Sequence, residues 1–242
     1  MVITKDFLCV FSLLCFGDHP MNDNGCPSNC ECNEGEVKSV ACNTKLDIES
    51  DFLFVNKWTT VAFKELTQVT SKQRKDFVLK TDNLIIDNYK EVNLLKSTKT
   101  TLIVQPKLLT VTNSHNFLHS SLIKIKPEKL EKLHFENVDF RESLYQPIMA
   151  LNEKTLSNIL SKNLKSLYLI DCNIDYVNSK ALKKFSTLTT LSLRKNRIKT
   201  PLEDNWFDTK FKKLRILDIS HNQIEKIDEK IFKIEWESIA HS

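Results

Sequence analysis

Three stretches decide the fold: LKSLYLIDCNI at 164–174, LTTLSLRKNRI at 188–198 and LRILDISHNQI at 214–224. Each has leucine or isoleucine at its first, fourth, sixth and eleventh residue and cysteine or asparagine at its ninth, and the starts lie 24 and 26 residues apart. Leu167 and Leu169 alternate, so both point to one side of a short strand. One such turn cannot bury its apolar side alone, so successive turns must stack on a shared core.

This spacing and period are the signature of the leucine-rich repeat. They predict an α/β repeat fold, a curved solenoid whose parallel strands line the concave face. LEKLHFENVDF from Leu130 is a degenerate copy, WTTVAFKEL from Trp58 and TDNLIIDNY from Thr81 are weaker, and KTTLIVQP from Lys99 is weaker still. We therefore expect about seven turns within 58–233, of which the last three are regular.

The step from Leu130 to Leu164 is 34 residues, too long for one turn. Its extra stretch, QPIMALNEKTLSNILSK at 146–162, has helical apolar spacing and predicts a helix on the convex or lateral side.

Polar residues follow the strands where the chain must bend away from the sheet. Asn196 and Asn222 are expected to satisfy carbonyl and amide groups of neighbouring turns. Cys172 stands at the same register, so we expect a buried, unreactive thiol. Phenylalanines three residues before a strand start are expected to fill the core on the convex side: Phe185, Phe211 and Phe232.

Glycine is scarce, with Gly17, Gly25 and Gly35 the only ones in 242 residues. Phosphate-binding loops and the nucleophile elbow both need glycine where the backbone is tightly bent. The common glycine-loop routes to nucleotide chemistry are therefore excluded. In the repeats, we expect asparagine and short polar stretches to make the bends that glycine makes elsewhere.

The amino terminus predicts a cleaved signal peptide over 1–17. FLCVFSLLCFG at 7–17 is an apolar run of eleven residues, shorter than the ~20 that span a bilayer, and small residues precede Asp18. A buried amphipathic helix is the alternative. Nothing later reads as a membrane span, so we expect a secreted, extracellular chain.

Four cysteines lie close together in a predicted cap over 18–57: Cys26, Cys30, Cys32 and Cys42. In a secreted chain they predict two disulfides, with zinc binding as the less favoured alternative. Four cysteines allow three pairings, and their spacing does not choose among them.

The signal, the C-P-x-x-C-x-C cap at 26–32 and repeats with a phenylalanine spine resemble the extracellular leucine-rich-repeat proteins of animals. That group includes Toll-type receptor ectodomains, Slit, small matrix leucine-rich proteins and secreted insect immune factors. The resemblance implies the pairs Cys26–Cys32 and Cys30–Cys42, and protein recognition of an innate-immune, adhesion or matrix type. The tail, 234–242, departs from the pattern because it supplies neither the next strand nor a cysteine cap. Either Trp236 and Ile239 close the solenoid, or the sequence is a piece of a longer receptor ectodomain.

The residues that flank the inward leucines are expected to point out across the concave face and bind a protein. They form three columns: Lys132, Ser166, Thr190 and Ile216; His134, Tyr168, Ser192 and Asp218; Glu136, Ile170, Arg194 and Ser220. Because interface hot spots favour aromatic and arginine side chains, we expect a binding patch at Tyr168, Ile170 and Arg194. The alternative is that these are ordinary surface residues.

Charge offers two further hypotheses. Residues 21–57 hold three lysines and seven acids, whereas 180–233 hold fourteen basic and seven acidic residues, so two chains could assemble through opposite ends. The basic runs RKNRIK at 194–199 and KFKKLR at 210–215 admit glycosaminoglycan binding, although a solvated lysine-rich surface is favoured. The net charge of +4 is too mild to indicate nucleic acid.

Catalysis has little support in the sequence. The six histidines form no H-E-x-x-H motif, and His115 and His119 lie in an irregular, polar stretch. We expect no enzyme activity, metal or cofactor.

Overall fold

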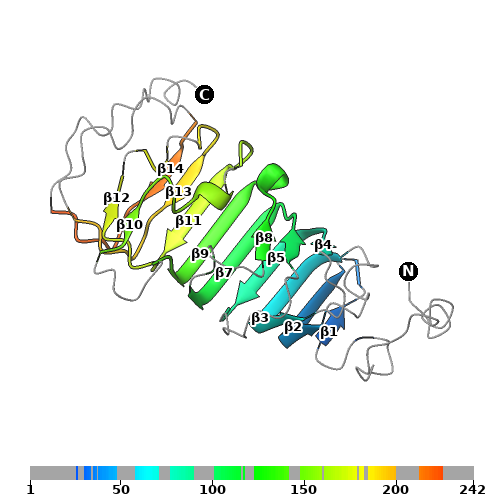
Figure 1. Ribbon diagram of the computed structural model, residues 1–242. Coiled ribbons are helices and arrows are strands. Elements are labelled where there is room, and N and C mark those ends of the chain that lie inside the picture. Colours follow the sequence, from blue (N-terminus) through cyan, green and yellow to red (C-terminus); the bar gives the residue numbers. More distant parts are fainter. Residues whose placement is uncertain are drawn as a thin grey trace.

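The computed structural model describes residues 26, 30–33, 35–36, 38–47, 58–70, 77–89, 101–115, 117, 123–141, 148–159, 161–178, 180–182, 185–199 and 213–225. Its main element is a nine-stranded sheet in the order β1-β2-β3-β5-β7-β9-β11-β13-β14 (Figure 1). The strands are β1 (Cys30–Asn33), β2 (Ser39–Asp47), β3 (Trp58–Thr70), β5 (Thr81–Asp87), β7 (Leu108–His115), β9 (Lys132–Asp139), β11 (Ser166–Ile170), β13 (Thr190–Ser192) and β14 (Ile216–Asp218). β1 and β2 form an antiparallel hairpin, and from β2 onward neighbouring strands pair in parallel. The predicted solenoid with parallel strands is confirmed.

Short strands lie in the segments that connect one main strand to the next. β4 (Phe77–Leu79), β6 (Leu102–Val104) and β8 (Ile123–Ile125) form a parallel three-stranded sheet, and β10 (Ala150–Leu151) pairs with β12 (Tyr176–Val177). The described connections also contain two 3-10 turns, η3 (Pro127–Lys129) and η4 (Ser157–Ile159). The solenoid therefore carries very little helix in the part that the structure describes.

Inward residues of the main sheet stack in register and build the core. One column of Cα partners runs Val61, Leu84, Leu109, Leu133, Leu167, Leu191 and Leu217. Its first six members are at most 1% exposed, and the connecting segments cover them with residues such as Leu79, Leu102 and Val104. Leu217 is only half-buried because it lies in the last strand of the described sheet. Each turn thus buries its apolar side against the next.

Aromatic side chains fill the middle of this core. Phe117 makes edge contacts with Tyr89 and Phe135, at ring-centroid distances of 5.6 and 6.1 Å. Phe185 is fully buried, as predicted. Phe211 and Phe232 lie outside the described residues.

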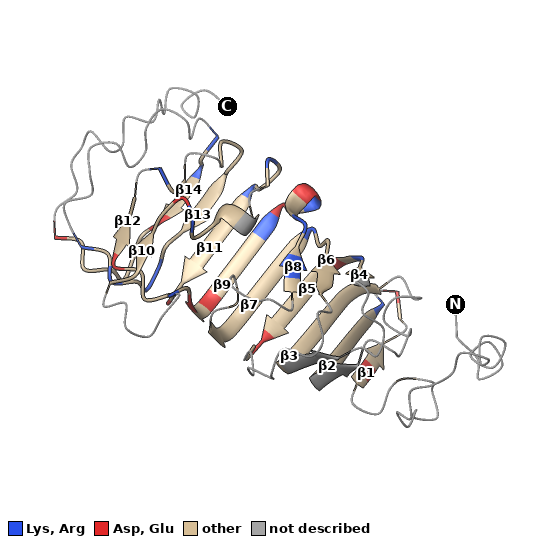
Figure 2. Cartoon of the chain, in the orientation of Figure 1, with Lys and Arg blue, Asp and Glu red and all other residues tan. Residues whose placement is uncertain are grey.

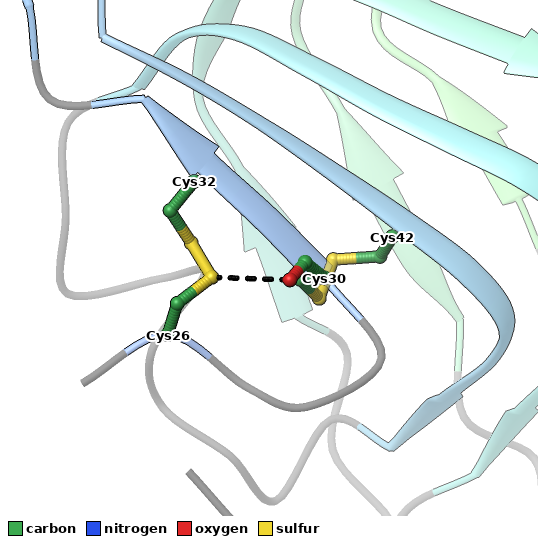
Figure 3. The surroundings of a disulfide bond; sticks show 4 residues. All are labelled: Cys26, Cys30, Cys32 and Cys42. Atoms are coloured by element: carbon green, nitrogen blue, oxygen red, sulfur yellow. Dashed lines mark hydrogen bonds between the residues drawn. A yellow bond between two sulfur atoms is a disulfide. The ribbon is translucent and has the colours of Figure 1, made fainter. Parts of the chain in front are cut away.

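Two disulfides fasten the β1–β2 hairpin at the amino-terminal end of the sheet (Figure 3). Cys30 and Cys42 are Cα partners across the hairpin and are joined by one bridge. The other bridge ties Cys32 to Cys26, whose sulfur lies 3.4 Å from the carbonyl oxygen of Cys30. The pairing implied by the resemblance is confirmed. Because β2 also pairs with β3, the cap and the repeats share one continuous sheet.

Two sequence-based expectations are wrong. KTTLIVQP does not supply a strand of the main sheet: its LIV forms β6 in the small sheet, and β7 takes the expected place between β5 and β9. Leu102, Ile103 and Val104 are all buried, a pattern of a strand covered on both faces, whereas β7 alternates buried and less buried residues. The predicted helix at 146–162 is also absent from its described part, which forms β10 and η4.

Asn196 joins two turns through hydrogen bonds made inside the core. Its Oδ1 accepts from the backbone N–H groups of Cys172 (3.0 Å) and Ile174 (3.1 Å). Its Nδ2 donates to the carbonyl oxygens of Leu169 (2.7 Å) and Leu193 (2.8 Å). These backbone groups would otherwise be buried without a partner, which costs about 1 to 3 kcal/mol for each. The predicted role of the asparagine is therefore confirmed.

Every turn has a residue with a left-handed backbone, with φ between 49° and 58°, and the β11 turn has a second, Asn173. The first of these lies inside the longer strands β3, β7 and β9 and beyond the ends of β5, β11, β13 and β14: Glu65, Asn88, Asn113, Asn137, Asp171, Lys195 and His221. Glycine adopts this conformation without strain, and asparagine, aspartate and histidine are enriched there. Asparagine fills three of these seven places, in agreement with its expected substitution for glycine, aspartate and histidine fill one each, and Glu65 and Lys195 belong to types that are not enriched there.

We predict that Asn196→Ala lowers the free energy of unfolding by about 3 kcal/mol, because it leaves several buried backbone groups without partners. Asn222→Ala should cost less, about 1 kcal/mol, because Asn222 is half-buried and water can replace its amide. Urea unfolding followed by circular dichroism measures both values. Equal losses in the two variants would contradict this account.

We also predict that Lys195→Gly raises the free energy of unfolding by up to about 1 kcal/mol, since it relieves a left-handed non-glycine residue. The matched control is Lys124→Gly, in β8, which should lower the free energy by about 1 kcal/mol. Both residues are exposed, so side-chain packing contributes little to either change. Losses of the same size would show that strain at Lys195 is negligible.

Candidate functional site

Outward residues of the main sheet form a surface on the side away from the core, which we call the open face. Its three columns follow the register of the strands. They are Thr60, Asn83, Leu108, Lys132, Ser166, Thr190 and Ile216; Ala62, Ile85, Thr110, His134, Tyr168, Ser192 and Asp218; and Lys64, Asp87, Thr112, Glu136 and Ile170. Arg194 and Ser220 continue the third column just after β13 and β14. The structure thus brings the predicted binding residues together on one face.

Tyr168 is at the centre of a cluster that joins β9 and β11. Its ring stacks on His134, with centroids 5.5 Å apart and an angle of 27° between the planes. The ammonium group of Lys132 lies 5.2 Å from the centre of the Tyr168 ring. The Nε2 atom of His134 is 3.3 Å from Oε2 of Glu136. Four polar side chains therefore contact one another on this face. The predicted columns placed His134 next to Tyr168 but did not indicate that their rings stack.

Arg194 and Ile216 lie beside this cluster toward the carboxy-terminal end. Arg194 is exposed, Ile216 is 58% exposed, and Ile170 is half-buried. Hydrogen bonds from Ser220, with the nearby charge of Arg194, lower the pKa of Asp218. Asp218 is thereby kept ionised, and its hydrogen bonds to Ser220 already occupy Oδ1.

The structure corrects the prediction that Ser192 is one of the binding residues. It lies in the middle column, yet it is only 4% exposed. Its small side chain sits between the larger residues Tyr168 and Asp218 in that column, and its hydroxyl is 3.4 Å from Oδ2 of Asp218. Ser192 therefore supports the surface from beneath and is not available to a partner.

A second polar network lies at the end of β5 and was not anticipated from the sequence. Thr112 Oγ1 and Asn113 Nδ2 donate to Oδ1 of Asp87 at 2.6 and 2.9 Å. Asn137 Nδ2 then donates to Oδ1 of Asn113 at 2.8 Å. The hydrogen bonds from Thr112 and Asn113 lower the pKa of Asp87. The Asp87 carboxylate therefore joins two turns, and Asn113 extends the network to a third.

The described residues offer no arrangement typical of catalysis or metal binding. Within them, no three His, Cys, Asp or Glu side chains come close enough to hold a metal ion. His115 is the Cα partner of Asp139, whereas His119 lies outside the described residues. In the same ranges, no helix has the length and apolar character needed to cross a lipid bilayer.

Cys172 is the free cysteine of the described chain, and it is fully buried. Burial raises the pKa of its thiol to about 12. The sulfur lies 3.2 Å from the carbonyl oxygen of Ile170, to which the thiol donates. A neutral, enclosed thiol cannot act as a nucleophile, so Cys172 is structural.

Comparison with known proteins agrees with this architecture. The family model described as leucine rich repeat matches residues 162–224. Searches of curated proteins and of solved structures returned no match. The match and the parallel solenoid together support a leucine-rich-repeat protein, a class of domain that serves protein interaction.

We predict that iodoacetamide leaves Cys172 unmodified in the native protein near pH 8. Only about one thiol in ten thousand would be ionised there, since the pKa is about 12. After unfolding in concentrated guanidinium, the peptide that contains Cys172 should be alkylated within minutes. Mass spectrometry of that peptide measures both states, and rapid modification of the native protein would contradict the buried, neutral thiol.

Proposed function

We propose that this chain is a secreted binding protein that recognises a protein partner through its open face. The observation that carries the proposal is the Tyr168 ring, which stacks on His134 and has the ammonium group of Lys132 near its centre, on the same face as Ile170 and Arg194. Aromatic and arginine side chains are the residues most enriched in interface hot spots. A side chain already held in place loses little conformational freedom on binding, so more of its contact energy appears as affinity.

Secretion is part of this proposal and is supported by two features. The two disulfides suit an oxidising compartment outside the cytosol. The apolar run at 7–17 has the length of a signal peptide core. An extracellular role in innate immunity, adhesion or matrix contact fits the resemblance described above.

We predict that the double variant Tyr168→Ala/Arg194→Ala binds the partner at least about thirtyfold more weakly, as expected for the loss of a hot spot worth about 2 kcal/mol. The partner is first captured from the protein's own extracellular fluid, and its affinity is then measured by surface plasmon resonance. The thermal midpoint should stay unchanged, because neither side chain is buried in the core.

The matched control is Val78→Ala/Lys124→Ala on the small sheet, where both side chains are exposed and lie away from the open face. The control should bind as the natural chain does. If the open-face variant also binds unchanged, the proposal is wrong. A dimer that dissociates at high salt would instead favour assembly between charged regions of two chains.

A further inference from the structure

Basic side chains recur along the edge of the main sheet where its strands begin. We call this the strand-start edge, and between β9 and β14 it comprises Lys129, Lys132, Lys162, Lys165, Lys213 and Arg215. Figure 2 shows β9 blue at its start and red near its arrowhead, so the two ends of this strand differ in charge. The strand-start edge also carries Glu128 and Glu131, so between β9 and β14 it holds six basic and two acidic residues. The opposite edge is more evenly mixed there, because Glu136, Asp139 and Asp171 lie among Arg141, Arg194, Lys195 and Arg197.

Backbone hydrogen bonds align one residue from each strand start, namely Glu131, Lys165, Thr189 and Arg215. The N–H of Lys165 donates to the carbonyl of Glu131, and the N–H of Thr189 donates to the carbonyl of Lys165. The N–H of Arg215 in turn donates to the carbonyl of Thr189. Adjacent strands are about 4.8 Å apart, so the row from β9 to β14 extends over roughly 14 Å at right angles to the strands.

Most of this positive charge is not neutralised by the protein. Lys165 pairs with Glu131 at 2.9 Å, but both side chains are largely exposed, so the pair is weak. Within the described residues, Lys129, Lys162, Lys213 and Arg215 make no ion pair with a carboxylate. By contrast, Asp139 near the opposite edge is held by three hydrogen bonds from the Arg141 side chain, at 2.9, 3.0 and 2.5 Å.

We propose that the strand-start edge binds a linear sulfated polysaccharide that runs across the strands. Exposed basic side chains before β9, β11 and β14, with Thr189 of the β13 turn between them, match a polymer that repeats its negative charges, and the attraction arises from release of counterions. The described parts of the edge offer no aromatic side chain on which a nucleic acid base could stack. Apart from Ile216 at its margin, they offer no exposed apolar anchor for a protein hot spot.

This edge is distinct from the open-face patch of the proposed function. Lys129, Lys162 and Lys213 are exposed and precede the strands, whereas Tyr168 and Arg194 lie in the middle column and at the strand ends. Lys132 borders both surfaces because it also lies over the Tyr168 ring. It is therefore left unchanged in the test.

The test compares two triple variants of equal charge. The edge variant is Lys129→Gln/Lys162→Gln/Lys213→Gln, and the control is Lys124→Gln/Lys180→Gln/Lys199→Gln, exposed lysines outside the row. Calorimetry with a heparin octasaccharide at several salt concentrations gives the dissociation constant and its salt dependence. We expect the full chain to bind at about 0.15 M salt. The edge variant should bind at least about tenfold more weakly, with the salt slope reduced by about 2 to 3, and the control should change less than about twofold.

Several outcomes would overturn the proposal: no binding by the full chain at physiological salt, or equal weakening in both triple variants. Single-stranded DNA or polyglutamate of matched charge that competes as well as heparin would also overturn it, since the edge would then not select a glycan. The Tyr168→Ala/Arg194→Ala variant should keep its affinity for heparin. Loss of heparin binding there would place the polyanion on the open face instead, whereas loss of the protein partner alone leaves the edge proposal intact.

Discussion

The structure depends on one constraint: the chain must leave the sheet at the end of every strand without burying an unpaired backbone group. Each turn meets it with two consecutive residues. The first has a left-handed backbone, such as Lys195 or His221, and turns the chain away. The second points into the core, and in the last two described turns it is an asparagine whose amide bonds backbone groups on both sides of the bend. The stacking of turns, and hence the register of the open face, follows from this pair.

The earlier turns keep the left-handed residue but differ in the inward residue that follows it. The inward residue is Leu66, Tyr89 or Val138, none of which can replace a side-chain amide, while Ser114 does so in part by accepting from the N–H of Tyr89. The main strands there are long, with 13 residues in β3 and 8 in β9, against 5 in β11 and 3 in β13. Backbone pairing therefore continues through the bend, as between β7 and β9, whose partners extend to His115 and Asp139. The family match at residues 162–224 covers the turns with short strands.

The sequence predicted the features that follow from its periodicity, namely the strands of the regular turns and their buried residues. Leu167, Leu169 and Cys172 occupy their expected buried places because alternation and the repeat spacing report them directly. The prediction for KTTLIVQP was wrong because an apolar run fits a strand in either sheet, and periodicity does not tell which sheet the strand joins. The predicted columns placed His134 next to Tyr168, and the backbone pairing of β9 with β11 agrees with that register in spite of the long insertion. The stacking of the two rings could not be predicted, because the repeat pattern fixes the positions of the backbones and not the conformations of outward side chains.

Inward residues build the core and outward residues form the surface, so the surface can acquire a function without a change in the core. Inward side chains are enclosed by two neighbouring turns, so a change at Leu191 disturbs three layers at once. Outward side chains rest on a backbone lattice that those layers hold fixed, so Tyr168 or Arg194 can be exchanged without altering the register. The backbone pairing also fixes the positions of the residues at the strand starts, such as Lys165, Thr189 and Arg215. Their side chains can therefore be exchanged for others of different charge without altering the open face. Two binding surfaces of different chemistry can therefore coexist on one solenoid with little energetic coupling between them.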